Sequence, residues 1–136
     1  MTNQLIRNLS VALLAAVSIS AQGSQKITVQ VPFAFHVGSS TLPSGEYTVD
    51  TDAAPGILRL RSMDSKSGVM IQSMSVQAPA ASSQGKLIFN KYGDEYFLSQ
   101  VWKPGTNTGC ELRKSRREIE VAASARRRSE SILARK

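Results

Sequence analysis

Hydrophobic and polar residues alternate strictly in the first part of the chain after residue 26. The apolar positions are Ile27, Val29, Val31, Phe33, Phe35 and Val37. Alternation with a period of two predicts a long strand that buries one face. Pro32 cannot donate a hydrogen bond to a neighbouring strand, so the strand is expected to bulge or break there.

Three further short strands are expected before residue 77, separated by segments with turn chemistry. Leu42-Pro43-Ser44-Gly45 predicts a turn, because Pro presets φ and Gly accepts a positive φ. The strands are expected at residues 46–51, around Leu58 and Leu60, and at residues 69–76.

The clearest hairpin has its turn at Gly93-Asp94, a dipeptide suited to a two-residue β-turn. This turn predicts a register that pairs Phe89 with Leu98 and Leu87 with Gln100. The face that carries these pairs is the more apolar one, so it is expected to point into the core.

Six short strands with Gly or Pro between most of them predict a mainly β fold, a small antiparallel barrel or sandwich built as a meander. All eight aromatic residues lie between Phe33 and Trp102, which places the expected core in this part of the chain. The β domain is therefore assigned to residues 22–112.

A helix is predicted near the C-terminus. Ser115 and Glu118 have the spacing of a capping box, in which Ser115 accepts from one free N–H and Glu118 reaches back to another. Residues 119–133 contain no Gly or Pro, so residues 113–136 are interpreted as a basic helical tail. Its apolar stripe is interrupted by Arg126 and Glu130, which predicts an exposed and partly frayed helix.

The N-terminus has the features of a secretory signal peptide. One basic residue, Arg7, precedes a nine-residue apolar run, Val11–Ile19, and small residues follow at the expected cleavage region. The run is too short to cross a bilayer, which needs about 20 apolar residues. Residues 1–21 are thus predicted to be a signal peptide, and the protein is expected to be secreted or periplasmic, with no membrane span after cleavage.

The net charge of +7 is concentrated in the C-terminal segment. Residues 22–112 carry seven basic and seven acidic side chains, whereas residues 113–136 carry nine basic and three acidic ones. Basic clusters attract acidic polymers, lipid head groups and nucleic acids. The candidate anion-binding residues are Arg113, Lys114, Arg116, Arg117, Arg126, Arg127 and Arg128. The alternative interpretation is a solvated tail that only aids solubility.

The chain has one Cys, Cys110, and one His, His36, so neither a disulfide framework nor a one-chain zinc site is expected. In an oxidising compartment Cys110 is a candidate for a disulfide-linked dimer; the alternative is a buried or incidental thiol. No phosphate-binding loop, nucleophile elbow or metal motif occurs, so no catalytic, cofactor or metal site is predicted.

Four stretches together resemble a group of small exported proteins of soil bacteria. They are Val31–Phe35, Leu42–Val49, Tyr92–Leu98 and the segment from Gly109 through Glu111-Leu112 to Ser115. The resemblance covers most of the chain after the predicted signal peptide and implies a small exported β domain, and it carries over no functional residues.

These features favour a binding or structural module of the cell envelope with an unknown envelope partner. The alternative is an anion-binding protein that acts through the Arg-rich tail. An enzyme is the remote third possibility, because no catalytic constellation is recognisable.

Overall fold

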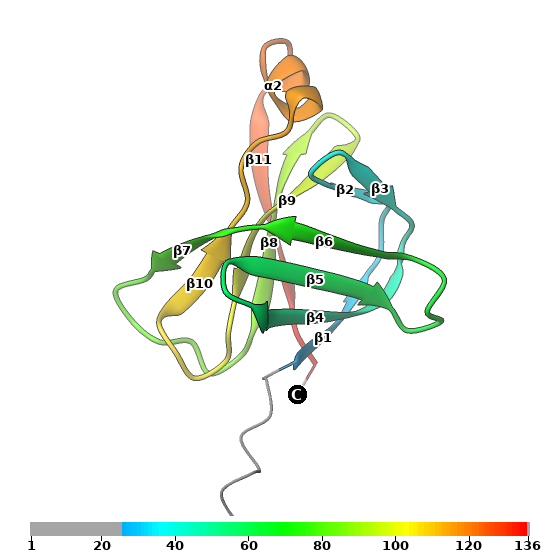
Figure 1. Cartoon of the computed structure of the whole chain (residues 1–136). Coiled ribbons are helices and arrows are strands. Elements are labelled where there is room, and N and C mark those ends of the chain that lie inside the picture. The colour runs from blue at the N-terminus through cyan, green and yellow to red at the C-terminus, as the bar shows by residue number, and fades with distance from the viewer. Residues whose placement is uncertain (1–25, 136) are drawn as a thin grey trace, which may run out of the picture.

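Residues 26–135 are described by the structure, a computed structural model (Figure 1). The signal peptide predicted for residues 1–21 lies outside the described residues.

Eleven strands and one short helix form in the described part of the chain. The first strands are β1 (Lys26–Val31), β2 (Phe35–Val37), β3 (Ser40–Leu42), β4 (Gly45–Ala54), β5 (Ile57–Ser62), β6 (Gly68–Gln72) and β7 (Met74–Gln77). They are followed by β8 (Lys86–Tyr92), β9 (Glu95–Trp102), β10 (Thr108–Glu111), α2 (Arg116–Ala122) and β11 (Arg127–Leu133).

The strands form two sheets that pack face to face (Figure 1). Sheet A has the order β1-β4-β5-β6, and all its pairs are antiparallel. Sheet B has the order β11-β8-β9-β10-β7, also antiparallel, and the small β2–β3 hairpin joins it through one parallel bridge to β9. The strands that the structure describes do not close into a barrel, so the arrangement is sandwich-like.

One continuous segment links the two sheets along one side. β6 is the edge of sheet A, and after a single residue, Ser73, the chain continues as β7 at the edge of sheet B. The Ser73 N–H donates to the Gly56 carbonyl at 2.9 Å, which fixes the crossing point. On the opposite side, Arg135 N–H donates to the Thr28 carbonyl at 2.9 Å and ties the end of sheet B to β1.

The core lies between the sheets, where alternate residues of each strand point inward. Its fully buried members include Val29, Val31, Phe35, Tyr47, Val49, Leu58, Leu60, Leu87, Phe89 and Val101. Phe35 and Phe89 meet edge to face, with ring centroids 5.4 Å apart. The predicted core region is therefore confirmed.

One local prediction is confirmed by the structure, and another agrees with it only in part. The first long strand breaks at Pro32 as expected, since β1 ends at Val31. The hairpin pairs Phe89 with Leu98 as predicted, but a bulge shifts the register between Ile88 and Phe89. Leu87 consequently faces Val101, not Gln100.

The bulge is accompanied by a hydrogen bond to a residue that is distant in the sequence. It leaves Ser99 without a directly paired residue on β8, and the Ser99 carbonyl accepts a hydrogen bond from Leu112 N–H at 2.9 Å. The bulge also lets both Leu87 and Val101 become fully buried. The hairpin sequence alone contains no sign of the distant Leu112, so the predicted register was wrong beyond Phe89.

The prediction of a helix through residue 133 was wrong in its second half. The helix begins after Ser115, as predicted, but ends at Ala122, and residues 127–133 form β11. All seven residues of β11 pair with β8. Pairing satisfies the backbone of β8 and brings Ile132 against the core, which outweighs the modest helix propensity of this segment.

The mainly β architecture with a C-terminal helix is confirmed. Residues 26–135 contain no helix that is long and apolar enough to span a bilayer.

Candidate functional site

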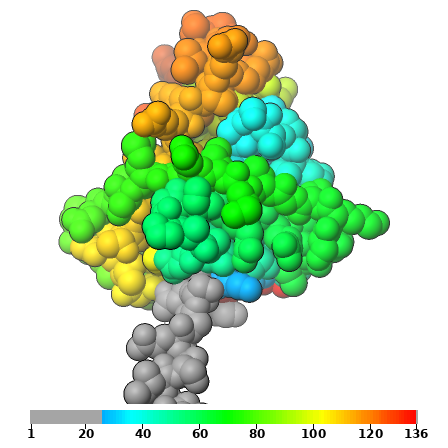
Figure 2. Space-filling model, in the orientation of Figure 1, coloured from blue at the N-terminus to red at the C-terminus, as the bar shows by residue number. Residues whose placement is uncertain are grey.

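The seven candidate anion-binding residues flank or belong to α2, at the narrow end of the molecule in Figures 1 and 2. We call this set the basic end. It comprises Arg113, Lys114, Arg116, Arg117, Arg126, Arg127 and Arg128, all of which are exposed. Within the described residues, only Arg117 of this set forms an ion pair.

A buried carboxylate anchors α2 to sheet B. Glu118 is 4% exposed, and its Oε2 accepts hydrogen bonds from Asn90 Nδ2 and from the Tyr92 hydroxyl, both at 2.9 Å. Ser115 caps the helix as predicted, since its Oγ accepts from Glu118 N–H at 3.2 Å. The Glu118 side chain, however, bonds to β8 and not back to Ser115, which corrects the second half of the predicted capping box.

The anchor perturbs the phenol that takes part in it. Burial, together with the adjacent Glu118 carboxylate, raises the pKa of Tyr92 to about 12, while the charge of Arg127 acts in the opposite direction. Tyr92 therefore stays protonated and donates to Glu118 at neutral pH.

A second anchor joins α2 to the hairpin turn and to β2. Arg117 binds the Glu95 carboxylate through Nε and Nη2 at 3.1 to 3.2 Å. The same carboxylate lies 3.5 Å from Nε2 of His36, whose ring stacks on Phe97. These contacts hold the basic end in a fixed position relative to the sandwich.

Several cations of the basic end stand where they do not favour folding. Lys91 and Arg128 are direct cross-strand neighbours, and like charges in that position repel. Arg116 occupies the first turn of α2, near the positive end of the helix dipole, and forms no ion pair with a described residue. An anion bound at the basic end would relieve both unfavourable placements.

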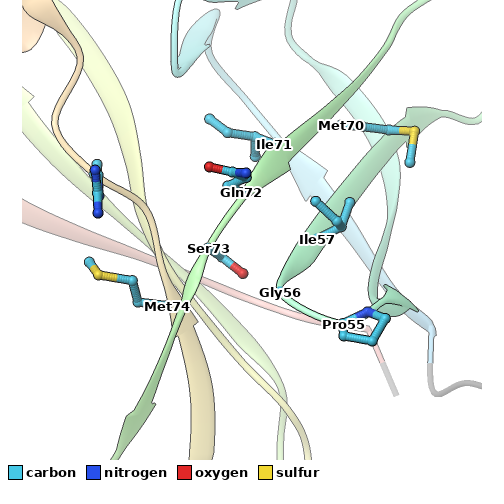
Figure 3. Close-up of a pocket in the computed structure, with 9 residues that line it drawn as sticks. Pro55, Gly56, Ile57, Met70, Ile71, Gln72, Ser73 and Met74 are labelled. Atoms are coloured by element: carbon cyan, nitrogen blue, oxygen red, sulfur yellow. The ribbon is translucent and has the colours of Figure 1, made fainter.

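A groove of about 610 Å³ lies beside the crossing between the sheets (Figure 3). It is lined by Pro55, Gly56, Ile57, Met70, Ile71, Gln72, Ser73, Met74 and Arg113. Figure 3 shows Ile57 of β5 beside Met70 of β6, with Met74 beyond Ser73. Met70 and Met74 are 61% and 47% exposed, so the groove presents flexible apolar side chains to solvent.

Arg113 belongs to both the groove and the basic end, and it is the only charged residue in the groove lining. The sequence analysis identified Arg113 but missed the groove. A signal existed, because Met70 stands in the outward phase of a strand whose inward positions are Val69 and Ile71. An apolar residue at an outward position marks an exposed apolar surface.

Cys110 lies in β10, between β9 and β7. It is half-buried and borders a second hollow of about 270 Å³. The lining of this hollow is mostly polar and consists of Thr51, Gly56, Ser73, Ser75, Lys103, Thr108, Gly109 and Cys110.

No group of three or more His, Cys, Asp or Glu residues that could hold a metal ion occurs in residues 26–135. Comparisons of the chain with family models, curated proteins and solved structures gave no match.

Proposed function

We propose that the protein is an exported, non-catalytic binding module of the cell envelope, and that its ligand is an anionic lipid. The headgroup binds the basic end and the acyl chain lies in the groove. The observation that carries the proposal is the position of Arg113, which joins the cationic surface to the apolar one.

Charge complementarity favours an anion at this surface. Six of the seven cations form no ion pair with a described residue, and their charges remain available to a phosphate or carboxylate. Such exposed contacts steer a ligand and weaken as salt rises.

The groove favours a lipid over an acidic polymer. A polymer of charged units gains little from exposed methionines, whereas an acyl chain gains about 25 cal/mol for each Å² of apolar surface removed from water. Met70 and Met74 would contribute to that burial only when the ligand carries an apolar part.

The test measures binding to vesicles of phosphatidylglycerol and of phosphatidylcholine in a salt series. We expect binding to the anionic vesicles only, weakened by salt. The double variant Met70→Gln/Met74→Gln should bind about tenfold more weakly, from loss of about 1.4 kcal/mol of apolar contact. Met63→Gln is the matched control, because Met63 is 55% exposed and lies outside the groove.

Binding to soluble dextran sulfate tests whether the ligand is an acidic polymer and not an anionic lipid. Binding of dextran sulfate as tight as that of the vesicles, unchanged in Met70→Gln/Met74→Gln, would overturn the lipid assignment in favour of an acidic polymer. Absence of binding to both ligands would overturn the anion-binding function itself.

A further inference from the structure

The hollow beside Cys110 interrupts the apolar interior of the sandwich. Along β4, Tyr47, Val49 and Thr51 share the inward phase, and the first two are fully buried core residues. Thr51 continues this series with a hydroxyl group and lines the hollow.

Cys110 points into the same space from the opposite sheet. It is the direct cross-strand partner of Val101, a fully buried core residue, and side chains of direct partners lie on the same side of a sheet. Ser75, its partner on β7, lines the hollow from the same side.

A buried hydroxyl in this hollow lacks a partner. Thr51 is 7% exposed, and its Oγ1 forms no hydrogen bond with any described residue. An unsatisfied buried polar atom costs about 1–3 kcal/mol, so it marks a position where a ligand group improves the structure.

One charged side chain lines the hollow, and its ion-pair partner, the exposed Asp52, lies outside the lining. The lining residue is Lys103, and Lys103 Nζ lies 3.0 Å from Asp52 Oδ1. An α-amino acid carries the complementary pair, a carboxylate for Lys103 and an ammonium group for Asp52. Hydroxyls of Ser75 and Thr108 supply further hydrogen-bonding groups.

We propose that the hollow is a binding site for a small amino-acid thiol, held as a mixed disulfide on Cys110. The Cys110 thiol loses its proton to solvent, and the thiolate attacks one sulfur of the symmetrical disulfide of that thiol. The new S–S bond forms on Cys110 as the old one breaks. The leaving thiolate takes up a proton, so Cys110 is oxidised and one half of the reagent is reduced.

The recessed position favours this product over a Cys110-linked dimer, one of the two interpretations of Cys110 that the sequence left open. A disulfide brings the two Cβ atoms to about 3.8 Å. Cys110 faces the interior beside the fully buried Val101, so two copies do not approach that closely unless the space between the sheets opens.

The experiment exposes the full-length protein to cystine and, separately, to 2-hydroxyethyl disulfide, which lacks both charges. Intact-mass spectrometry detects the covalent addition of one half of the disulfide reagent to the protein. We expect a cysteinylated monomer, formed with a severalfold rate preference for cystine. Cys110→Ser should remain unmodified.

Two substitutions test the geometry. Lys103→Met should remove the preference for cystine while leaving the rate with 2-hydroxyethyl disulfide unchanged. Thr51→Val should make the cysteinyl adduct about threefold to tenfold easier to reduce, as expected for one lost hydrogen bond. The proposal is overturned by a disulfide-linked dimer as the main product, by failure of the folded protein to react, or by unchanged values in both variants.

Discussion

At the scale of single residues, Glu118 links the basic surface to the fold. Its carboxylate is buried yet receives two hydrogen bonds from β8, so its charge is compensated inside the protein. The exposed arginines on either side of it depend on this contact for their fixed placement. Glu118 thus fixes the position of α2, whereas the exposed arginines carry the positive charge.

Tyr92 makes the stability of this contact dependent on pH. Its pKa is about 12 in the folded protein, against an ordinary value of 10.0. Below pH 10 the phenol is protonated in both states, and its contribution to stability is fully present. Above pH 10 the unfolded chain ionises first, so stability falls as the pH rises toward 12.

We expect the thermal unfolding midpoint to decrease between pH 10 and 12, and we expect Tyr92→Phe to reduce that decrease. Tyr96→Phe is the matched control, because Tyr96 stacks on Phe33 and not on the Glu118 contact. An equal alkaline decrease in wild type and Tyr92→Phe would contradict the role assigned to this phenol.

At the scale of elements, local patterns predicted the strands well where one face is buried and the other is wet. Ile27, Val29 and Val31 show this directly, since all three are buried as their alternation requires. Local patterns did not predict the features that depend on contact with a residue or strand distant in the sequence. The bulge at Ser99 depends on Leu112, and β11 depends on the edge of β8.

The sequence predicted the part of the candidate site that is local in the chain and missed the part that distant segments form together. The basic residues are visible as a cluster in the sequence, and all of them are exposed. The groove that shares Arg113 is assembled from β5, β6 and the segment before α2, and no local pattern contains these three pieces together.

Because β11 is part of sheet B, removal of residues 127–136 should destabilise the whole fold. We expect the free energy of unfolding to fall by about 3 kcal/mol or more, from lost strand pairing and from exposure of Leu87 and Phe89. Urea unfolding followed by circular dichroism measures this change.

The matched variant Arg127→Gln/Arg128→Gln keeps the strand and removes its charge, so its unfolding midpoint should equal that of wild type or lie slightly above it, because the repulsion between Arg128 and Lys91 is lost. A truncated protein as stable as the full chain would contradict the contribution of β11. The same result would restore the interpretation of residues 113–136 as a separable tail.

At the scale of the whole molecule, charge is distributed unevenly. Residues 22–112 are neutral in sum, and the excess of cations lies in residues 113–136. Most of the basic residues in the described part of that segment flank or belong to α2, which lies at one end of the sandwich (Figure 2). The field of the protein is therefore directional.

The salt concentration at which the protein elutes from a cation-exchange column tests this uneven distribution of charge. The triple variant Arg126→Gln/Arg127→Gln/Arg128→Gln should elute at much lower salt than wild type. The control, Lys26→Gln/Arg61→Gln/Lys66→Gln, removes the same charge from exposed positions on the body. We expect its shift to be smaller by about twofold, because a directional field binds the resin through one end. Equal shifts would contradict a directional field.

The place of β11 in sheet B also determines when the sheet is completed during synthesis. β8 leaves the ribosome well before residues 127–133, so its outer edge has no partner until the last described strand is made. An unpaired edge is a template for pairing with other chains. Nascent chains that stall before residue 127 should consequently associate with one another. Once β11 is made, it covers the edge of β8 and this association stops.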